Sequence, residues 1–60
     1  MDDRLAYTID EFRKATGLGR STIFEEIRAG RLKSVSVGRR RLIPRRAAEE
    51  YFAAKLDAAS

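Results

Sequence analysis

The chain has 60 residues, which is enough for one small domain and too few for a second hydrophobic core. It has no cysteine and no histidine, so a disulfide framework is excluded and the commonest metal ligand and general base are missing. The longest apolar run, 51–54, is much shorter than a membrane span or the core of a signal peptide. We therefore expect a cytoplasmic protein with a single domain over 1–60, a core over about 7–57, and no metal or cofactor.

Positive charge is concentrated in the middle of the chain. The formal net charge is +4, but residues 13–46 hold 11 Lys or Arg and two Glu, a local charge of +9, while the flanks carry −5. Five arginines fall between Arg39 and Arg46. Such a basic centre is typical of a protein that binds a polyanion, and a solvated surface is the alternative. A membrane surface fits less well, because it usually requires a basic amphipathic helix.

A first helix is predicted over 9–16. Thr8 and Glu11 are spaced for a capping box, in which each side chain accepts a hydrogen bond from the other residue's amide. Gly17 suits the left-handed position that follows a helix. Residues 1–6, in contrast, show no pattern and are expected to fray. The residues of this helix expected to face inward are Phe12 and Ala15.

A second helix is predicted over 20–29, after the short connection 17–19 and before Gly30. Two short helices joined by a three-residue turn with glycine form the helix-turn-helix pattern. At 100° per residue, one stripe of the second helix is apolar and the opposite face is polar. The expected buried stripe is Ile23, Phe24 and Ile27. The residues expected to point outward are Ser21, Glu25 and Arg28, with Thr22 at the edge.

A two-stranded hairpin and a third helix complete the chain. Segment 32–37 shows the alternation of a half-buried strand, Gly38 and Arg39 fit a type II′ turn, and 40–43 returns as the second strand. Pro44 ends that strand and suits a helix entry. The last helix is predicted over 45–57. Its expected inward residues are Ala48, Phe52 and Leu56, with Tyr51 alongside.

These elements predict a mainly α domain with a small β-hairpin, the winged helix-turn-helix architecture. Catalysis is not expected. The stretch 17–22 lacks both the third glycine of a dinucleotide loop and the lysine of a phosphate loop. The carboxylates come as sequence neighbours, and one small core leaves little room for a substrate pocket.

The second helix has the residue types that read DNA in the major groove. The candidates are Arg20, Ser21 and Thr22 at its start, then Glu25 and Arg28. Hydroxyls can contact phosphates or bases, and Glu25 can accept a hydrogen bond from a cytosine amino group. Two alternatives stay open: Ser21 or Thr22 caps the helix, or Glu25 pairs with Arg28 at i,i+3. Glu26 opposes phosphate binding, and the sequence suggests no function for it.

The hairpin tip is the second candidate contact, with Gly38, Arg39, Arg40 and Arg41. An arginine-tipped ribbon can follow the phosphate backbone or lie in a narrow minor groove. Strand alternation puts Arg39 and Arg41 on one side and Arg40 on the other, so not all three are expected to contact DNA. The alternative is that these charges only protect an edge strand from aggregation.

Several segments together resemble the excisionase-type winged helix-turn-helix domain, a relative of the MerR DNA-binding domain. The resemblance covers about residues 7–56, and its combined spacing is more specific than any single piece. The matching segments are Tyr7-Thr8-Ile9-Asp10-Glu11, Gly17-Leu18-Gly19-Arg20-Ser21-Thr22-Ile23-Phe24, Gly30-Arg31-Leu32-Lys33, Val37-Gly38-Arg39-Arg40 and Ile43-Pro44-Arg45.

This resemblance implies a recognition helix at 20–28 in the major groove and a wing at 37–41 on the adjacent minor groove. It implies a phage excisionase that binds and bends double-stranded attachment-site DNA, with copies side by side, and steers a tyrosine integrase toward excision. A small transcriptional regulator on the same fold is one alternative. Another is a protein-interaction module in which Tyr51, Phe52 and Leu56 dock a partner.

Overall fold

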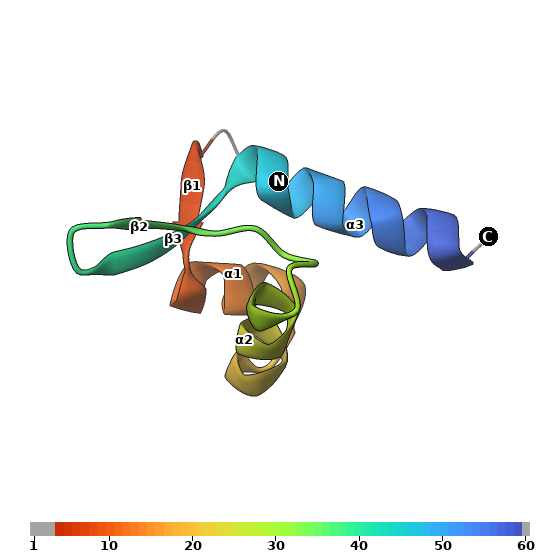
Figure 1. Ribbon diagram of the computed structural model, residues 1–60, viewed down its shortest axis with the longest axis horizontal. Coiled ribbons are helices and arrows are strands. Elements are labelled where there is room, and N and C mark those ends of the chain that lie inside the picture. Colours follow the sequence, from red (N-terminus) through yellow and green to blue (C-terminus); the bar gives the residue numbers. More distant parts are fainter. Residues whose placement is uncertain (1–3, 60) are drawn as a thin grey trace.

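The computed structural model describes residues 4–59, which form three helices and a small sheet (Figure 1). The elements in chain order are β1 (Ala6–Thr8), α1 (Ile9–Thr16), α2 (Arg20–Arg28), β2 (Val35–Val37), β3 (Arg40–Pro44) and α3 (Arg45–Ala59). The helix-turn-helix followed by a hairpin and a third helix confirms the winged helix-turn-helix architecture. No helix in this range is long and apolar enough to cross a bilayer.

The sheet has three antiparallel strands in the order β1-β3-β2, where two were expected. Ala6 pairs with Pro44 and Thr8 with Leu42, so the expectation that residues 1–6 fray is wrong for Ala6, while residues 1–3 lie outside the described part. The Arg45 amide also donates to the Leu5 carbonyl at 2.9 Å. Pairing on both sides therefore makes β3 the central strand.

The hairpin turn has the predicted geometry. Val37 pairs with Arg40, and Gly38 has a φ of +62° while no described non-glycine residue has a positive φ. That combination fits a type II′ turn, which needs its left-handed residue first. Strand β2 begins at Val35, three residues later than expected, and Leu32 is buried in the core from the loop before it. Strand β3 includes Pro44 and so ends one residue beyond the predicted range 40–43.

Local hydrogen bonds fix the ends of α1. The Glu11 amide donates to Thr8 Oγ1 at 3.1 Å and the Thr8 amide donates to Glu11 Oε1 at 2.9 Å, which confirms the capping box. Gly17 follows the helix with a φ of +79°, and its amide donates to the Arg13 carbonyl at 2.8 Å. These contacts fix where α1 begins and where it ends.

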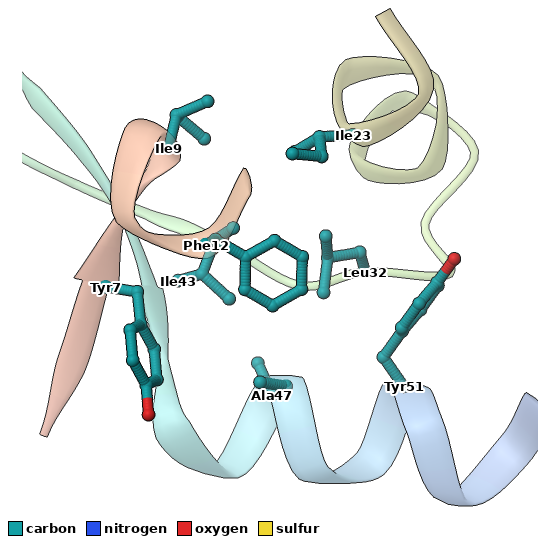
Figure 2. Packing of buried hydrophobic residues seen from close by; sticks show 9 residues of the cluster. Tyr7, Ile9, Phe12, Ile23, Leu32, Ile43, Ala47 and Tyr51 are labelled. Atoms are coloured by element: carbon teal, nitrogen blue, oxygen red, sulfur yellow. The ribbon is translucent and has the colours of Figure 1, made fainter. Parts of the chain in front are cut away.

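Phe12 occupies the centre of the core (Figure 2). Its side chain is 1% exposed, and Ile23, Leu32 and Ile43 around it are as fully buried. The ring of Phe12 on α1 is therefore surrounded by all the other parts of the fold: α2, α3, the sheet and the loop before β2. The full core is Tyr7, Ile9, Phe12, Ile23, Leu32, Ile43, Ala47, Ala48 and Tyr51. Ala15 is exposed, so its predicted inward position is wrong.

The buried face of α3 agrees with the prediction at Ala48 and Tyr51 and differs from it at Phe52 and Leu56. Ala47, Ala48 and Tyr51 are buried, whereas Phe52 is 40% exposed and Leu56 is 71% exposed. The reason is the length of the helix: its C-terminal turns extend past the rest of the molecule, so Leu56 has no core to reach (Figure 1). Only the first half of α3 contributes to the hydrophobic core.

We expect Phe12→Ala to destabilise the fold by about 3–5 kcal/mol, because it removes a fully buried ring from the centre of the core. A domain of this length has only a few kcal/mol of stability, so much of the variant should be unfolded at 25 °C. Urea denaturation followed by circular dichroism measures the change. Leu56→Ala is the control, expected to change stability by less than about 0.5 kcal/mol; comparable losses in the two variants would contradict this picture of the core.

Candidate nucleic-acid interface

The outer face of α2 forms a shallow open groove lined by Arg20, Ser21, Phe24, Glu25 and Arg28. Four of these five residues are predicted candidates for DNA contact. The fifth, Phe24, is 36% exposed, so its assignment to the buried stripe is wrong. Ile23 is buried as predicted, Ile27 is partly buried against the core, and Glu26 is buried as well. The groove combines two arginines, a hydroxyl, a carboxylate and an aromatic ring on one helix face.

Arg20 is oriented by contacts at both sides of its guanidinium. Its Nη1 donates to Asp10 Oδ1 of α1 at 3.0 Å, and its Cζ lies 5.6 Å from the centroid of the Phe24 ring. Both partners are solvent-accessible, so the pair with Asp10 contributes little to stability. Its effect is to hold one cation at the N-terminal end of α2, beside the groove.

The structure decides the alternatives for the hydroxyls and for Glu25. Gly19 is the N-cap of α2 and no side chain caps the helix, so neither Ser21 nor Thr22 serves as a cap. Within residues 4–59, Glu25 forms no ion pair with Arg28. Ser21 lines the groove, whereas Thr22 is exposed outside it. The Ser21 hydroxyl is thus not used for capping, and the Glu25 carboxylate is not used for pairing with Arg28.

The base of the hairpin adjoins α2. A second shallow groove is lined by Phe24, Ile27, Arg28 and Arg41, so Arg28 of the helix and Arg41 of β3 lie along the same surface. The Arg41 guanidinium donates to Ser34 Oγ at 2.8 Å, which orients it across the hairpin. The outer face of α2 and the root of the wing therefore form one continuous surface.

The wing tip projects away from the body of the molecule (Figure 1). Gly38, Arg39 and Arg40 are all exposed there. In the described part of the chain, neither Arg39 nor Arg40 has an ion pair with a carboxylate. Their charges are therefore uncompensated at close range, which favours attraction to an anion.

Glu26 is the residue whose role the sequence did not reveal. It is only 7% exposed, and its carboxylate accepts hydrogen bonds from Tyr51 Oη of α3 at 2.7 Å and from Arg31 Nε at 2.8 Å. Lys55 Nζ lies 3.3 Å from the same carboxylate. Glu26 therefore points away from any DNA on the outer face and joins α2 to α3.

These contacts shift the pKa values of both buried partners. The hydrogen bond from Arg31, with that from Tyr51, lowers the pKa of Glu26 from 4.5 to about 2. Burial, together with the hydrogen bond to Glu26, raises the pKa of Tyr51 from 10.0 to about 12. The carboxylate and the protonated phenol are therefore the paired forms over a wide range around neutral pH.

Two further features of the described residues concern metal binding and the docking of a protein partner. Between residues 4 and 59, no group of three or more His, Cys, Asp or Glu gathers to hold a metal ion. An open apolar groove lies between the end of α1 and α3, lined by Ala15, Thr16, Glu49, Phe52, Ala53 and Leu56. Tyr51 is buried and does not belong to this groove, so of the three predicted docking residues only Phe52 and Leu56 are available.

Comparison with known proteins places the chain among helix-turn-helix proteins. The family described as "Helix-turn-helix domain" matches residues 6–55. A probable excisionase from Saccharopolyspora erythraea is 40% identical over 53 residues. The match covers 88% of this chain and 54% of that protein, so the chain spans about half the length of this curated relative. No solved structure gave a significant match.

We expect the fold to lose stability as the pH falls from about 4.5 to about 2. The sign follows from the lowered pKa: the unfolded chain takes up a proton at Glu26 before the folded chain does, so protonation favours unfolding. In Glu26→Gln the urea midpoint should be lower at pH 7 and should depend much less on pH in this window. Urea titrations between pH 2 and 7 measure both effects.

The matched control is Glu25→Gln, which alters the exposed neighbour of Glu26. This variant should keep the acid-dependent loss of the parent chain. A Glu26→Gln variant whose stability falls with acid as steeply as that of the parent would show that the buried carboxylate does not dominate.

Proposed function

Because this chain belongs to the helix-turn-helix domain family, we propose that it is a sequence-specific DNA-binding protein that acts as an excisionase. The observation that carries this is the continuous basic surface from Arg20 and Arg28 on α2 to Arg41 at the root of the wing. The similarity to a probable excisionase over 88% of the chain supports the specific role. The protein needs no catalytic group for it.

In the proposed complex, α2 lies in the major groove and the wing contacts the adjacent minor groove or backbone. Ser21, Glu25 and Arg28 then face base edges, and Arg20 faces the phosphates near the start of the helix. Arg39 and Arg40, with Arg41 at the root, follow the phosphate backbone from a turn that Gly38 makes possible. Thr22 sits at the margin and makes at most a backbone contact.

The proposed role includes bending of attachment-site DNA and direction of a tyrosine integrase toward excision, in the host cytoplasm or nucleoid. One domain with a single helix in the groove contacts few base pairs, so several copies bound side by side supply the affinity. A protein partner needs a surface away from the DNA. The apolar groove with Phe52 and Leu56 between α1 and α3 is that surface in this proposal.

The same groove favours a second candidate function, a protein-interaction module whose arginines only keep it soluble. A transcriptional regulator on the same fold is a third, and it shares the DNA surface. Salt dependence of DNA binding separates the first function from the module. The identity of the bound DNA, attachment site or promoter, separates the excisionase from the regulator.

We expect affinity for duplex DNA to fall steeply with salt, with a log–log slope near −5 if about six phosphates are neutralised. Arg39→Ala/Arg40→Ala should make the slope shallower by about two units, because each phosphate contact accounts for about 0.9. Fluorescence anisotropy with a labelled duplex between about 50 and 200 mM salt measures the slope.

Arg39→Lys/Arg40→Lys is the matched control, since it keeps both charges at the wing tip. Its slope should stay close to that of the parent chain. Equal slopes for the alanine variant and the parent would remove the wing from the interface, and binding without salt dependence would favour the protein-interaction module.

Excisionase function also predicts binding at a defined attachment region, which can be tested with DNA from the genome that carries the gene. The protein should protect a discrete segment of the attachment region in a nuclease footprint, and adding it should switch an integrase reaction from integration to excision. Arg39→Ala/Arg40→Ala should lose most of the excision while remaining folded by circular dichroism. Protection of a promoter in place of the attachment region would identify a transcriptional regulator, and protection of neither would refute DNA binding at natural sites.

A further inference from the structure

Phe24 is an aromatic ring placed among polar groups on the face proposed to enter the major groove. It lines one groove together with Ser21 and Arg28, and it lines the next together with Arg28 and Arg41. In a chain whose core has nine residues, leaving a phenylalanine 36% exposed forgoes part of its hydrophobic contribution to folding. This position is therefore not explained by the packing of the core.

The Arg20 guanidinium holds the Phe24 ring in place, and part of the ring stays exposed. The Arg20 guanidinium lies 5.6 Å from the ring centroid, and Arg20 is itself bonded to Asp10. The part of Phe24 that stays exposed, 36%, lines the two grooves. The exposed part of Phe24 is thus an oriented apolar patch inside a charged surface.

A patch of this kind matches one feature of the major groove. Thymine is the only base that presents a methyl group there, and the other base edges present hydrogen-bond donors and acceptors. An aromatic ring cannot replace the water on a donor or acceptor, but it can bury a methyl group. Ser21, Glu25 and Arg28 around the ring can serve the polar edges of neighbouring bases.

We propose that Phe24 contacts the 5-methyl group of a thymine and so determines part of the DNA sequence preference. The inference rests on the proposed function and adds a residue and a base to it. The competing explanation is that the Phe24 ring only holds the Arg20 guanidinium in position. In that case the affinity for DNA still depends on Phe24, but not on the thymine methyl group.

Deoxyuridine separates the two explanations, because it differs from thymidine only in lacking that methyl group. Binding sites are first selected from a random duplex library with the full chain. Each fixed thymine of the selected site is then replaced in turn by deoxyuridine, and the dissociation constants are measured by anisotropy at constant salt. One replacement should weaken binding by about fourfold, the effect of one buried methyl-sized group.

The variants assign this effect to Phe24. Phe24→Ala should bind the thymine and deoxyuridine duplexes equally well, and Phe24→Gln should do the same if the alanine variant does not fold. Leu5→Ala is the control, because it removes an apolar side chain that is 84% exposed and lines neither groove. It should keep the fourfold preference of the parent chain.

The inference is overturned if the parent chain ignores every replacement, if the Phe24 variants keep the preference, or if the selected site has no fixed thymine. Each of these leaves tight binding to the selected duplex intact, so the proposed function survives them. Selection of no duplex at all is a different result, visible in the absolute affinity, and it removes both proposals.

Discussion

The carboxylate of Glu26 fixes how α2 sits on the rest of the molecule. Its side chain binds Tyr51 of α3 and Arg31 of the following loop, while its backbone carbonyl accepts from the amides of Arg31 and Leu32 at 3.0 and 3.1 Å. A buried carboxylate is tolerated only when its oxygens are satisfied, so any rotation of α2 that breaks these bonds is costly. The outer face of α2 is therefore presented at one defined angle.

Short-range signals in the sequence predicted the elements well. The bounds of α1 match the prediction, and α2 ends one residue earlier than expected. Capping by Thr8 and Glu11 and the left-handed glycines at 17 and 38 depend only on residues a few positions apart. Four of the residues predicted for the second helix also share one face, because helix periodicity is a local property. The position of Arg41 beside that helix is a tertiary contact.

The features that the sequence did not reveal all depend on contacts distant along the chain. Strand β1 is three residues long, and its partner β3 begins more than thirty residues later. Glu26 looked like an unfavourable charge because its partner on α3, Tyr51, is 25 residues away, although Arg31 is only five residues away. On α3, apolar periodicity continues into turns that have no core to face, so Leu56 fits the pattern yet remains exposed. Burial depends on the other elements that pack against a helix, and a helical wheel gives no information about them.

The pairing of β1 with β3 supports the hairpin that forms the wing. Strand β3 is held on one edge by β1 and on the other by β2, and the Arg45 amide donates to Leu5 at the far end of the ladder. The strand that leads from the hairpin tip to α3 is therefore paired with a neighbour on each side, which ties the wing to the body of the domain. A shortened chain that starts at Ile9 would lose β1, the Thr8 cap of α1 and the buried ring of Tyr7, and it would expose an edge of β3 prone to aggregation.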